Sequence, residues 1–282
     1  MKDIIIANKY ILLEKIGMGK FGVVYKGIHR KTQQYVAIKM EKRDQEIATI
    51  KHETTILNHL YRKGCRDVPF VLWYGVYMDY TCLTMTYFER TLSEIKDKLV
   101  NENEKVNKIM YRILEIIENV HEQYVIHRDI KIDNFMILEN EIFIIDFGLA
   151  TFYIDENNEH IPYKKREYIT GTPKYISINI HNGIEPSRRD DLISIGYLYL
   201  YLYYGNLPWN NIPNMDILND KNVPINNLHI LNGQNAYIKE KKEWLVLKNT
   251  LINCGCDKYM DYCYNLKYTE KPNYSILKNM FL

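Results

Sequence analysis

The sequence predicts an α+β protein of two lobes, a small β-rich N-terminal lobe followed by a larger α-helical C-terminal lobe. Residues before about position 90 alternate between apolar and polar side chains in short runs, as strands do. From about Leu92 onward, apolar residues recur at the three- and four-residue spacing of helices. We place a hinge at residues 86–90, which gives an N-terminal lobe of residues 1–88 and a C-terminal lobe of residues 89–282 within one domain, 10–282.

Composition and charge are those of an ordinary globular protein and exclude several functional classes. The chain has 282 residues, and its 37 basic and 35 acidic ones leave a formal charge of +2, unlike a strongly basic nucleic-acid-binding domain. Its five scattered cysteines form no zinc pattern. We expect no signal peptide, because only a short apolar run follows Met1–Asp3, and the longest apolar run, Leu192 to Tyr204, is too short to span a bilayer. We therefore expect an intracellular protein, cytoplasmic or nuclear or both, with no nucleic-acid or membrane partner.

The N-terminal lobe is predicted to hold five strands and one helix. The strands alternate apolar and polar residues, and the helix carries apolar side chains along one face. In chain order these elements are the strands Tyr10–Ile16, Gly22–His29 and Tyr35–Met40, the helix Gln45–Tyr61, and the strands Phe70–Tyr77 and Thr81–Phe88.

Helices dominate the predicted C-terminal lobe. One opens at Thr91–Glu94, a long amphipathic one covers Lys105–Gln123, and a mostly apolar one covers Arg188–Tyr204. A short strand is predicted at Ile142–Ile145. The segment 210–236 is rich in Asn, Pro and Asp, so we expect a surface loop or insertion there.

A glycine-rich motif lies between the first two strands. Gly17, Gly19 and Gly22 follow the pattern GxGxxGxV over Gly17–Val24. Because glycine has no Cβ, the backbone can approach a phosphate group closely and direct N–H groups at its oxygens. The pattern also fits a plain hairpin turn, and it occurs in dinucleotide-binding folds, where it should open a helix. Its position between two strands favours the phosphate-binding loop of a phosphotransferase.

Lys39 ends the apolar strand segment Val36–Lys39, and Glu53 follows 14 residues later inside the predicted helix. Phosphotransferases of this kind bind ATP phosphates with a strand lysine that a helix glutamate holds in place. A lysine at the solvated edge of a strand is the alternative, and the nearby charges Glu41, Glu46 and Lys51 then form one solvated face. Together with the glycine-rich motif, the spacing favours the pairing of Lys39 with Glu53.

The strongest signal comes from two motifs, HRDIKIDN starting at His127 and DFG starting at Asp146. Asp129 is predicted to accept the proton of a substrate hydroxyl or to orient that hydroxyl. Lys131 would offset the charge of the transferred phosphoryl group, and Asn134 and Asp146 would hold Mg²⁺ against the ATP phosphates. A chance occurrence of both motifs at this spacing is the alternative. The sequence thus predicts phosphoryl transfer from ATP with Mg²⁺ as the metal ion.

Two further segments indicate a particular family. Gly171–Asn179 reads GTPKYISIN and Gly183–Leu192 reads GIEPSRRDDL. Most eukaryotic protein kinases end the activation segment with Ala-Pro-Glu, whereas the casein kinase 1 family has Ser-Ile-Asn, as at Ser177–Asn179. From Tyr10 to Phe281 the chain resembles that family. The resemblance implies a bilobal protein-kinase fold and an enzyme that phosphorylates protein serine and threonine hydroxyls.

The resemblance also implies roles for individual residues. Thr172 resembles the threonine that bridges the catalytic aspartate and lysine, and Asp191 resembles a buried aspartate that holds the catalytic loop. Met85 is similar to the gatekeeper, and Thr86 to Phe88 to the hinge that binds adenine through its backbone. The other residues expected to line the ATP site are Ile16, Val24, Ala37, Met136 and Ile145.

Casein kinase 1 enzymes favour acidic or already phosphorylated substrates, which a basic patch near the activation segment recognises. The arginine of that patch corresponds to Lys174 here, and a nearby lysine corresponds to Glu167. Lysine keeps the charge but loses the bidentate geometry of arginine. We expect Lys164, Lys165 and Arg166 to supply replacement charge at this substrate anion site, with Lys239, Lys241 and Lys242 as further candidates. A solvated charge run is the alternative for each group.

Two other functions remain possible alternatives on the sequence alone. One is a pseudokinase that acts as an interaction scaffold, although every predicted catalytic residue is present. The other is a small-molecule kinase of similar fold, which typically lacks the peptide-receiving segment Gly171–Asn179. Tyrosine specificity is disfavoured because Lys131 is the serine/threonine form of the catalytic loop. We expect a monomer whose partners are protein substrates.

Overall fold

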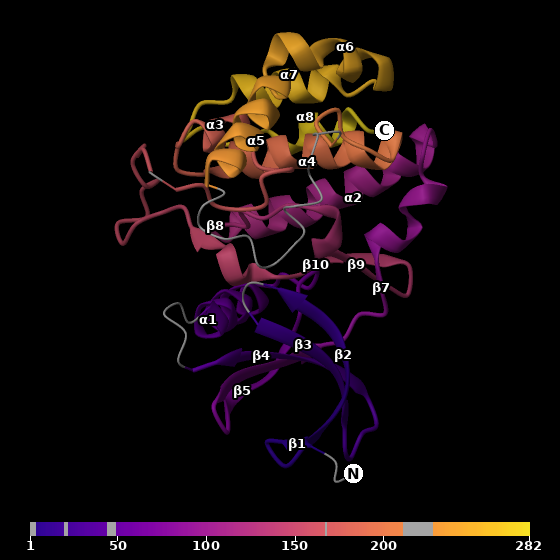
Figure 1. Cartoon of the computed structure of the whole chain (residues 1–282), viewed down its shortest axis with the longest axis vertical. Coiled ribbons are helices and arrows are strands. Elements are labelled where there is room, and N and C mark those ends of the chain that lie inside the picture. Colours follow the sequence, from indigo (N-terminus) through magenta and orange to yellow (C-terminus); the bar gives the residue numbers. More distant parts are fainter. Residues whose placement is uncertain (1–3, 20–21, 44–48, 167, 211–227) are drawn as a thin grey trace. The chain divides into compact units, whose positions relative to one another are not determined.

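The computed structural model describes residues 4–19, 22–43, 49–166, 168–210 and 228–282, with the backbone alone for residues 228–233. The chain divides into two units (Figure 1). Residues 1–92 and 133–151 form the first unit, and residues 93–132 and 152–282 form the second unit. The first unit is β-rich and the second is helical, so the predicted α+β fold class is confirmed. The hinge at residues 86–90 stays a prediction.

The first unit is built on a six-stranded antiparallel sheet in which the strands lie in the order β1-β2-β3-β4-β6-β5. Its register aligns positions that the sequence singled out, because Val24 of β3 lies opposite both Gly17 of β2 and Lys39 of β4. On the other side of β4, Ala37 lies opposite Met85 of β6. The strands are β1 (Ile5–Ile6), β2 (Tyr10–Gly19), β3 (Gly22–His29), β4 (Tyr35–Lys42), β5 (Val71–Tyr77) and β6 (Tyr80–Thr86).

Helix α1 (Thr49–Arg62) packs on this sheet through a face that includes the fully buried Ile50, Leu57 and Leu60. The sequence predicted this helix from Gln45, but residues 44–48 lie outside the described residues. A small sheet and two 3₁₀ turns complete the first unit; they are β7 (Arg90–Thr91), β9 (Phe135–Leu138), β10 (Glu141–Ile144), η2 (Ile132–Asn134) and η3 (Phe147–Leu149).

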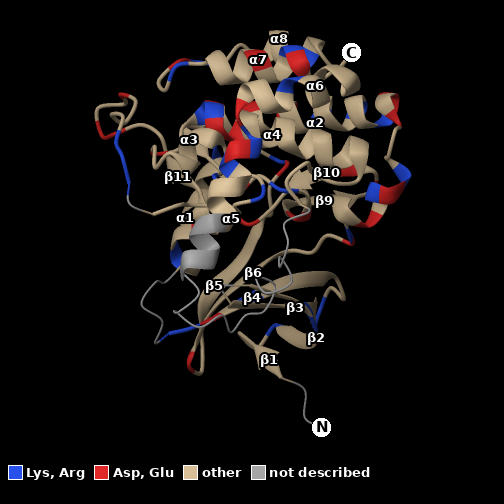
Figure 2. Ribbon diagram, turned by 45° about the horizontal axis from the view of Figure 1, so that its top comes forward, with Lys and Arg blue, Asp and Glu red and all other residues tan. Residues whose placement is uncertain are grey.

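The second unit is organised around α4 (Arg188–Tyr204), the bounds of which match the prediction. Its charges are confined to the first turn (Figure 2). Every residue from Leu192 to Leu202 is buried. The helix begins at a capping box in which Ser187 and Asp190 exchange side-chain and backbone hydrogen bonds. The remaining elements are η1 (Leu92–Lys98), α2 (Asn103–Glu122), β8 (Val125–Ile126), β11 (Thr151–Phe152), α3 (Ile178–His181), α5 (Leu228–Lys241), α6 (Trp244–Cys254), α7 (Asp257–Asn265) and α8 (Tyr274–Asn279).

Two predictions for this unit need correction. The helix expected at Thr91–Glu94 is a 3₁₀ helix, η1. Of the predicted loop or insertion at 210–236, residues 211–227 lie outside the described residues, whereas residues 228–236 belong to helix α5. The loop prediction is therefore wrong for that second part, because Asn and Gly lower helix propensity without preventing a helix that packs on others. Within the described ranges, none of the helices combines the length and apolar character that crossing a bilayer requires.

Candidate active site

The glycine-rich motif joins β2 to β3 in the first unit, with Gly19 paired to Gly22 across the ladder. Residues 20–21 between them lie outside the described residues. Gly22 has a φ of +118°, and a Cβ at this position would collide with the backbone carbonyl of Met40. Only glycine can adopt this φ without strain and also avoid the collision. The motif therefore lets β3 begin directly against β4, the strand that carries Lys39.

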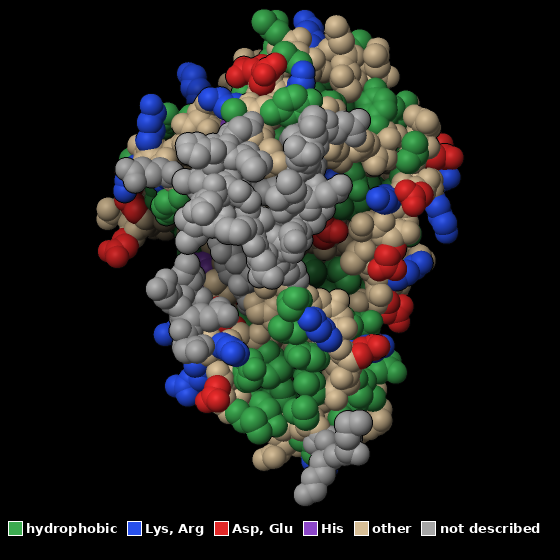
Figure 3. Space-filling view, viewed as in Figure 1, with side chains coloured by type: hydrophobic (Ala, Val, Ile, Leu, Met, Phe, Trp, Pro, Cys, Tyr) green, Lys and Arg blue, Asp and Glu red, His purple; other side chains and the backbone are tan. Residues whose placement is uncertain are grey.

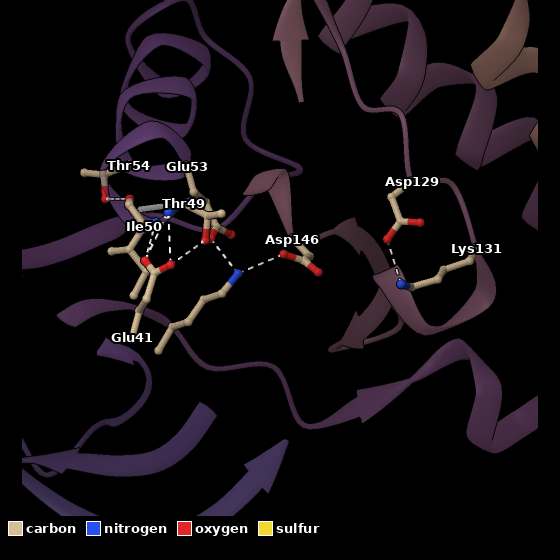
Figure 4. Close-up of polar contacts among 9 residues, drawn as sticks. Glu41, Thr49, Ile50, Glu53, Thr54, Asp129, Lys131 and Asp146 are labelled. Atoms are coloured by element: carbon tan, nitrogen blue, oxygen red, sulfur yellow. Dashed lines mark hydrogen bonds and ion pairs between the residues drawn. The ribbon is translucent and has the colours of Figure 1, made fainter. Parts of the chain in front are cut away.

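Lys39 forms a buried ion cluster with Glu53 of α1 and Asp146 (Figure 4). Its Nζ lies 2.6 Å from Glu53 Oε2 and 2.9 Å from Asp146 Oδ1, and the exposed fraction is 6% for Lys39 and 1% for Glu53. Burial alone would lower the pKa of Lys39, but the two carboxylates outweigh it and raise that pKa. Burial raises the pKa of Glu53, and the charge of Lys39 opposes that shift. Lys39 is thus a fixed cation within the first unit.

Glu41, two residues after Lys39 on β4, holds the start of α1. Its buried carboxylate accepts the backbone N–H groups of Thr49 and Ile50, each at 3.1 Å (Figure 4). These N–H groups belong to the first turn of the helix and have no partner within it. The start of α1 is therefore fixed to the same strand as Lys39, and Glu53 follows one turn later. Sequence reasoning treated Glu41 as a solvated charge and missed this contact.

Asn134 and Asp146 lie on neighbouring segments of the first unit, because the N–H of Ile145 donates to the carbonyl of Asn134 at 2.9 Å. The backbone of Asp146 is left-handed, with a φ of 64°, and its side chain is one-third exposed. No group of three or more His, Cys, Asp or Glu that could enclose a metal occurs among the residues described.

This donor set fits magnesium. Mg²⁺ prefers oxygen ligands and is commonly held by one or two carboxylates together with substrate phosphates. The amide oxygen of Asn134 and the carboxylate of Asp146 would supply such ligands. A bound ion would draw the phosphates of a nucleotide together and neutralise part of their charge.

The predicted hinge also lies in the first unit, after β6. The N–H of Thr86 donates to the carbonyl of Phe70 at 3.1 Å, so this N–H is already used. In contrast, the backbone N–H and carbonyl of Phe88 make no hydrogen bond within the part of the chain that the structure describes. The Phe88 ring is buried against Phe143, with ring centroids 4.7 Å apart. Phe88 can therefore offer its backbone groups to an adenine while its side chain stays in the core.

The other residues predicted to line the ATP site come from the same unit. Ala37 and Met85 are both 8% exposed and lie opposite each other, whereas Val24, Met136 and Ile145 are half-buried. Ile16 of β2 is 46% exposed and belongs to a set of exposed apolar side chains on this strand. Apolar side chains also gather on the visible surface of the first unit (Figure 3). The structure thus gives the nucleotide residues an apolar setting within one unit.

The catalytic loop lies in the second unit. Figure 4 shows the side chains of Lys131 and Asp129 pointing toward each other. Lys131 Nζ lies 2.6 Å from Asp129 Oδ2, and the hydroxyl of Thr172 donates to Asp129 Oδ1 at 2.6 Å. The Lys131 ammonium also lies 3.4 Å from Thr172 Oγ1. Asp129 is 7% exposed. Each carboxylate oxygen has a second lone pair, so Asp129 can still accept a hydrogen bond from a substrate hydroxyl.

Asp191, at the start of α4, fixes the backbone of this loop. Its carboxylate accepts the N–H of His127 at 2.8 Å and that of Arg128 at 2.9 Å, and it also bonds His121 Nε2 at 2.9 Å. Burial alone would raise the pKa of Asp191, but the bond to His121 and the backbone donors outweigh it and lower that pKa. Asp191 is therefore an ionised anchor inside the second unit. Arg128 has a positive φ of 67°, which the anchor holds in place.

The Ser-Ile-Asn segment binds the same helix start through a different aspartate. Ser177 Oγ donates to Asp190 Oδ1 at 2.5 Å, and Asn179 Nδ2 donates to that oxygen at 3.0 Å. Ser177 Oγ also accepts the N–H of Ile180 and caps α3. A serine and an asparagine thus tie the end of the activation segment to α4.

Lys242, directly after α5, supports this segment from the other side. It is fully buried and donates to the carbonyls of Pro173 and Ile176 at 2.9 and 2.6 Å. The sequence predicted either replacement charge for the anion site or a solvated charge run at Lys239, Lys241 and Lys242, and both are wrong for the buried Lys242. The one signal in the sequence is its spacing of four residues from the buried Ile238, which places both on one helix face.

Lys164 and Lys165 contact their neighbours through the backbone, since the carbonyl of Lys164 accepts the N–H of Glu185 and Lys165 pairs with Ile184. Both side chains are exposed, and the described contacts do not join them with Lys174 into one anion site. Lys174 lies with its Nζ 4.1 Å from the centre of the Tyr201 ring. Arg166, also predicted to supply charge at this site, instead lies together with Arg128 against the buried carboxylate of Glu185.

Nucleotide-binding and magnesium-binding candidates thus come from the first unit, and Asp129, Lys131 and Thr172 come from the second. A comparison with family models finds the protein kinase domain over residues 10–277, which include every predicted site residue. The match spans most of the chain and agrees with the β-rich and helical units described above. The chain therefore belongs to the protein kinase family.

Proposed function

We propose that this protein kinase is a casein kinase 1-like enzyme that uses ATP and Mg²⁺ to phosphorylate serine and threonine hydroxyls of proteins. The observation that carries the proposal is the contact of Asp129 with both Lys131 and Thr172. A lysine two residues after the catalytic aspartate stabilises the transferred phosphoryl group, and a threonine that bridges the two keeps both in position.

The end of the activation segment supports the same assignment. Ser177 and Asn179 share Asp190 as their acceptor, so this kinase fixes the segment without the Ala-Pro-Glu of most protein kinases. The hydrogen bonds of Lys242 to Pro173 and Ile176 add a second attachment. A fixed segment of this length suits a peptide acceptor better than a small molecule.

We further propose a preference for acidic or already phosphorylated substrates. Lys164 and Lys165 are exposed, and Lys174 lies on the aromatic ring of Tyr201, which limits the directions it can take. Three lysines attract phosphate as point charges, without the bidentate geometry of arginine. The preference is therefore expected to be weaker and more salt-dependent than one that an arginine provides.

The test is phosphoryl transfer from ATP and Mg²⁺ to casein by the full chain and by Asp129→Asn. The parent is expected to phosphorylate serine and threonine, and Asp129→Asn is expected to lose about 10²–10⁴-fold in rate. Asp261→Asn, an exposed change on α7, is the matched control and should keep the parent rate.

Mass spectrometry of the product identifies the residue type that accepts the phosphoryl group. A comparison of the rates on native and dephosphorylated casein tests the preference for phosphorylated substrates. Phosphotyrosine as the main product would contradict the serine/threonine assignment. Binding of ATP without any transfer would favour the scaffold alternative. Equal rates on native and dephosphorylated casein would contradict the preference for phosphorylated substrates alone.

A further inference from the structure

A chain of hydrogen bonds links the C-terminal helix to the catalytic loop inside the second unit. The Tyr274 hydroxyl of α8 lies 2.5 Å from His121 Nδ1, and His121 Nε2 lies 2.9 Å from Asp191, which holds the loop. Burial lowers the pKa of His121, so its ring is neutral at neutral pH. A neutral ring with its proton on Nε2 donates to Asp191 and accepts from Tyr274. All three side chains are buried.

A cavity of about 360 Å³ opens beside these residues. This volume lies near the lower end of the range of about 300–1,000 Å³ that small-molecule sites occupy. The residues that line it come from the end of α2, the start of α4, Tyr153 and the region of α8, and they are His121, Glu122, Gln123, Tyr124, Tyr153, Arg188, Lys271 and Tyr274. None of them belongs to the predicted ATP, metal or substrate sites.

Arg188 is the unusual member of this lining, because it is a buried cation without a counter-ion. It is 8% exposed, and no Asp or Glu carboxylate lies within 4.0 Å of it in the described part of the chain. Its neighbour Arg189, by contrast, lies 3.9 Å from Asp190. The guanidinium of Arg188 donates to the Tyr153 hydroxyl at 3.3 Å and to the carbonyl of Thr269 at 2.8 Å, both uncharged acceptors.

The hydrogen bonds of Arg188 leave part of its capacity unused. A guanidinium has five N–H groups, and these two bonds use one on each terminal nitrogen. Its Nε–H has no acceptor among the described residues. The ring of Tyr153 lies 4.5 Å from the guanidinium carbon and compensates part of the charge. Burying an unpaired charge is costly, so an anion at this position would stabilise the second unit.

The rest of the lining adds to the positive charge. Lys271 is exposed at the cavity and has no hydrogen bond or ion pair among the described residues. Glu122 is the one acidic residue of the lining, and it is exposed, so water screens its charge. Two cations against one carboxylate leave the cavity with a net positive charge.

We propose that this cavity binds a phosphate group, either free phosphate or a phosphate carried by a small molecule or side chain. The terminal N–H groups of Arg188 and the ammonium of Lys271 are its donors. The planar guanidinium provides the geometry that phosphate oxygens favour, and Lys271 adds a mobile charge at the entrance. This site is separate from the predicted substrate anion site, which involves Lys164, Lys165 and Lys174.

The test is a titration of the full chain, without nucleotide, with inorganic phosphate at constant ionic strength and pH. In ¹⁵N-labelled protein, the Nε–H signal of Arg188 is assigned by its loss in Arg188→Lys. This signal is expected to shift and to saturate with phosphate. The same titration on a Lys39→Met background removes binding of phosphate at Lys39 and should leave the Arg188 response unchanged.

Two exposed lysines provide a matched pair that does not disturb the core. Lys271→Gln removes one charged donor and is expected to weaken the affinity for phosphate, read from the Arg188 signal, about tenfold. Lys267→Gln, four residues earlier and outside the lining, is expected to leave it unchanged. A second titration with O-phosphoserine distinguishes the sources of the phosphate group. If O-phosphoserine binds more tightly than inorganic phosphate does, the ligand is a phosphorylated side chain. If the two bind equally, the ligand is free phosphate.

The outcomes that would overturn the proposal are equally specific. An Arg188 signal that does not move while other arginine signals shift would place phosphate elsewhere on the protein. An equal affinity of Lys271→Gln and the parent would remove Lys271 from the site and contradict the proposed donor set.

Discussion

The charge of Lys39 is the residue-scale feature on which the proposed chemistry depends most. Two carboxylates, Glu53 and Asp146, lie within 2.9 Å of its ammonium and keep it protonated in a buried setting. A cation that is already fixed needs little rearrangement when it binds phosphate oxygens, and such preorganisation is a large part of catalysis.

Replacement of Lys39 by methionine keeps most of the side-chain volume and removes the charge. The loss of the cation is expected to reduce phosphoryl transfer by ~10²-fold or more and to leave two buried carboxylates without a partner. Steady-state kinetics with ATP as the varied substrate measure the loss. Lys42→Met, an exposed change on the same strand, is the control, and an equal loss in both variants would contradict the role of Lys39.

At the scale of elements, Glu41 determines where α1 begins relative to β4. Its carboxylate accepts two N–H groups of the first helical turn, and anions are favoured at this end of a helix. Since Glu53 lies just over one turn further along α1, a shift of the helix start would move Glu53 away from Lys39. The ion pair between Glu53 and Lys39 therefore depends on the contact of Glu41 with the start of α1.

Glu41→Ala is expected to destabilise the fold by about 1 kcal/mol, as loss of a helix cap does. Amide hydrogen exchange at Thr49 and Ile50 should accelerate, because both N–H groups lose their acceptor. The rate of phosphoryl transfer should fall as well, and Glu41→Gln should restore part of it through its amide oxygen. Glu14→Ala, an exposed change on β2, should alter neither quantity; an unchanged exchange rate in Glu41→Ala would refute the capping role.

Sequence periodicity predicted the elements well where a motif or a buried face repeats. It placed β3 at Gly22–His29 and α4 at Arg188–Tyr204 without error, since alternation and capping signals are local. It failed for Glu41 and Lys242, whose partners lie on other elements. Contacts between distant elements leave no periodic signal, so a buried charge resembles a solvated one in the sequence.

At the scale of the whole molecule, acid is expected to unfold this protein through histidines that fold in their neutral form. Burial lowers the pKa of His121, and burial with the charge of Lys242 lowers that of His181 to about 3. The ordinary pKa of histidine is 6.5, so below about this pH the unfolded chain binds protons that the native chain does not. Stability is therefore present above about pH 6.5 and declines as the pH falls toward the native values.

Urea denaturation from about pH 7 to about pH 5 measures this decline. The urea midpoint is expected to fall as the pH falls. The change of the midpoint per pH unit should be smaller in His181→Asn, which has one titrating group fewer. A midpoint that stays level or rises toward pH 5 would contradict the assignment of neutral buried histidines.

The burial of Lys242 has a consequence for the covalent reactivity of the native chain. Acylating reagents attack neutral, reachable amines, and burial lowers the pKa of the Lys242 amine well below its ordinary value. This shift lasts only while the amine is buried, and its exposure is then 0%, so a reagent cannot reach it while the helix ahead of it is docked. Lys242 acquires the label only when it leaves Pro173 and Ile176. The labelling rate of Lys242, relative to that of Lys241, therefore measures the rate at which the activation segment is released.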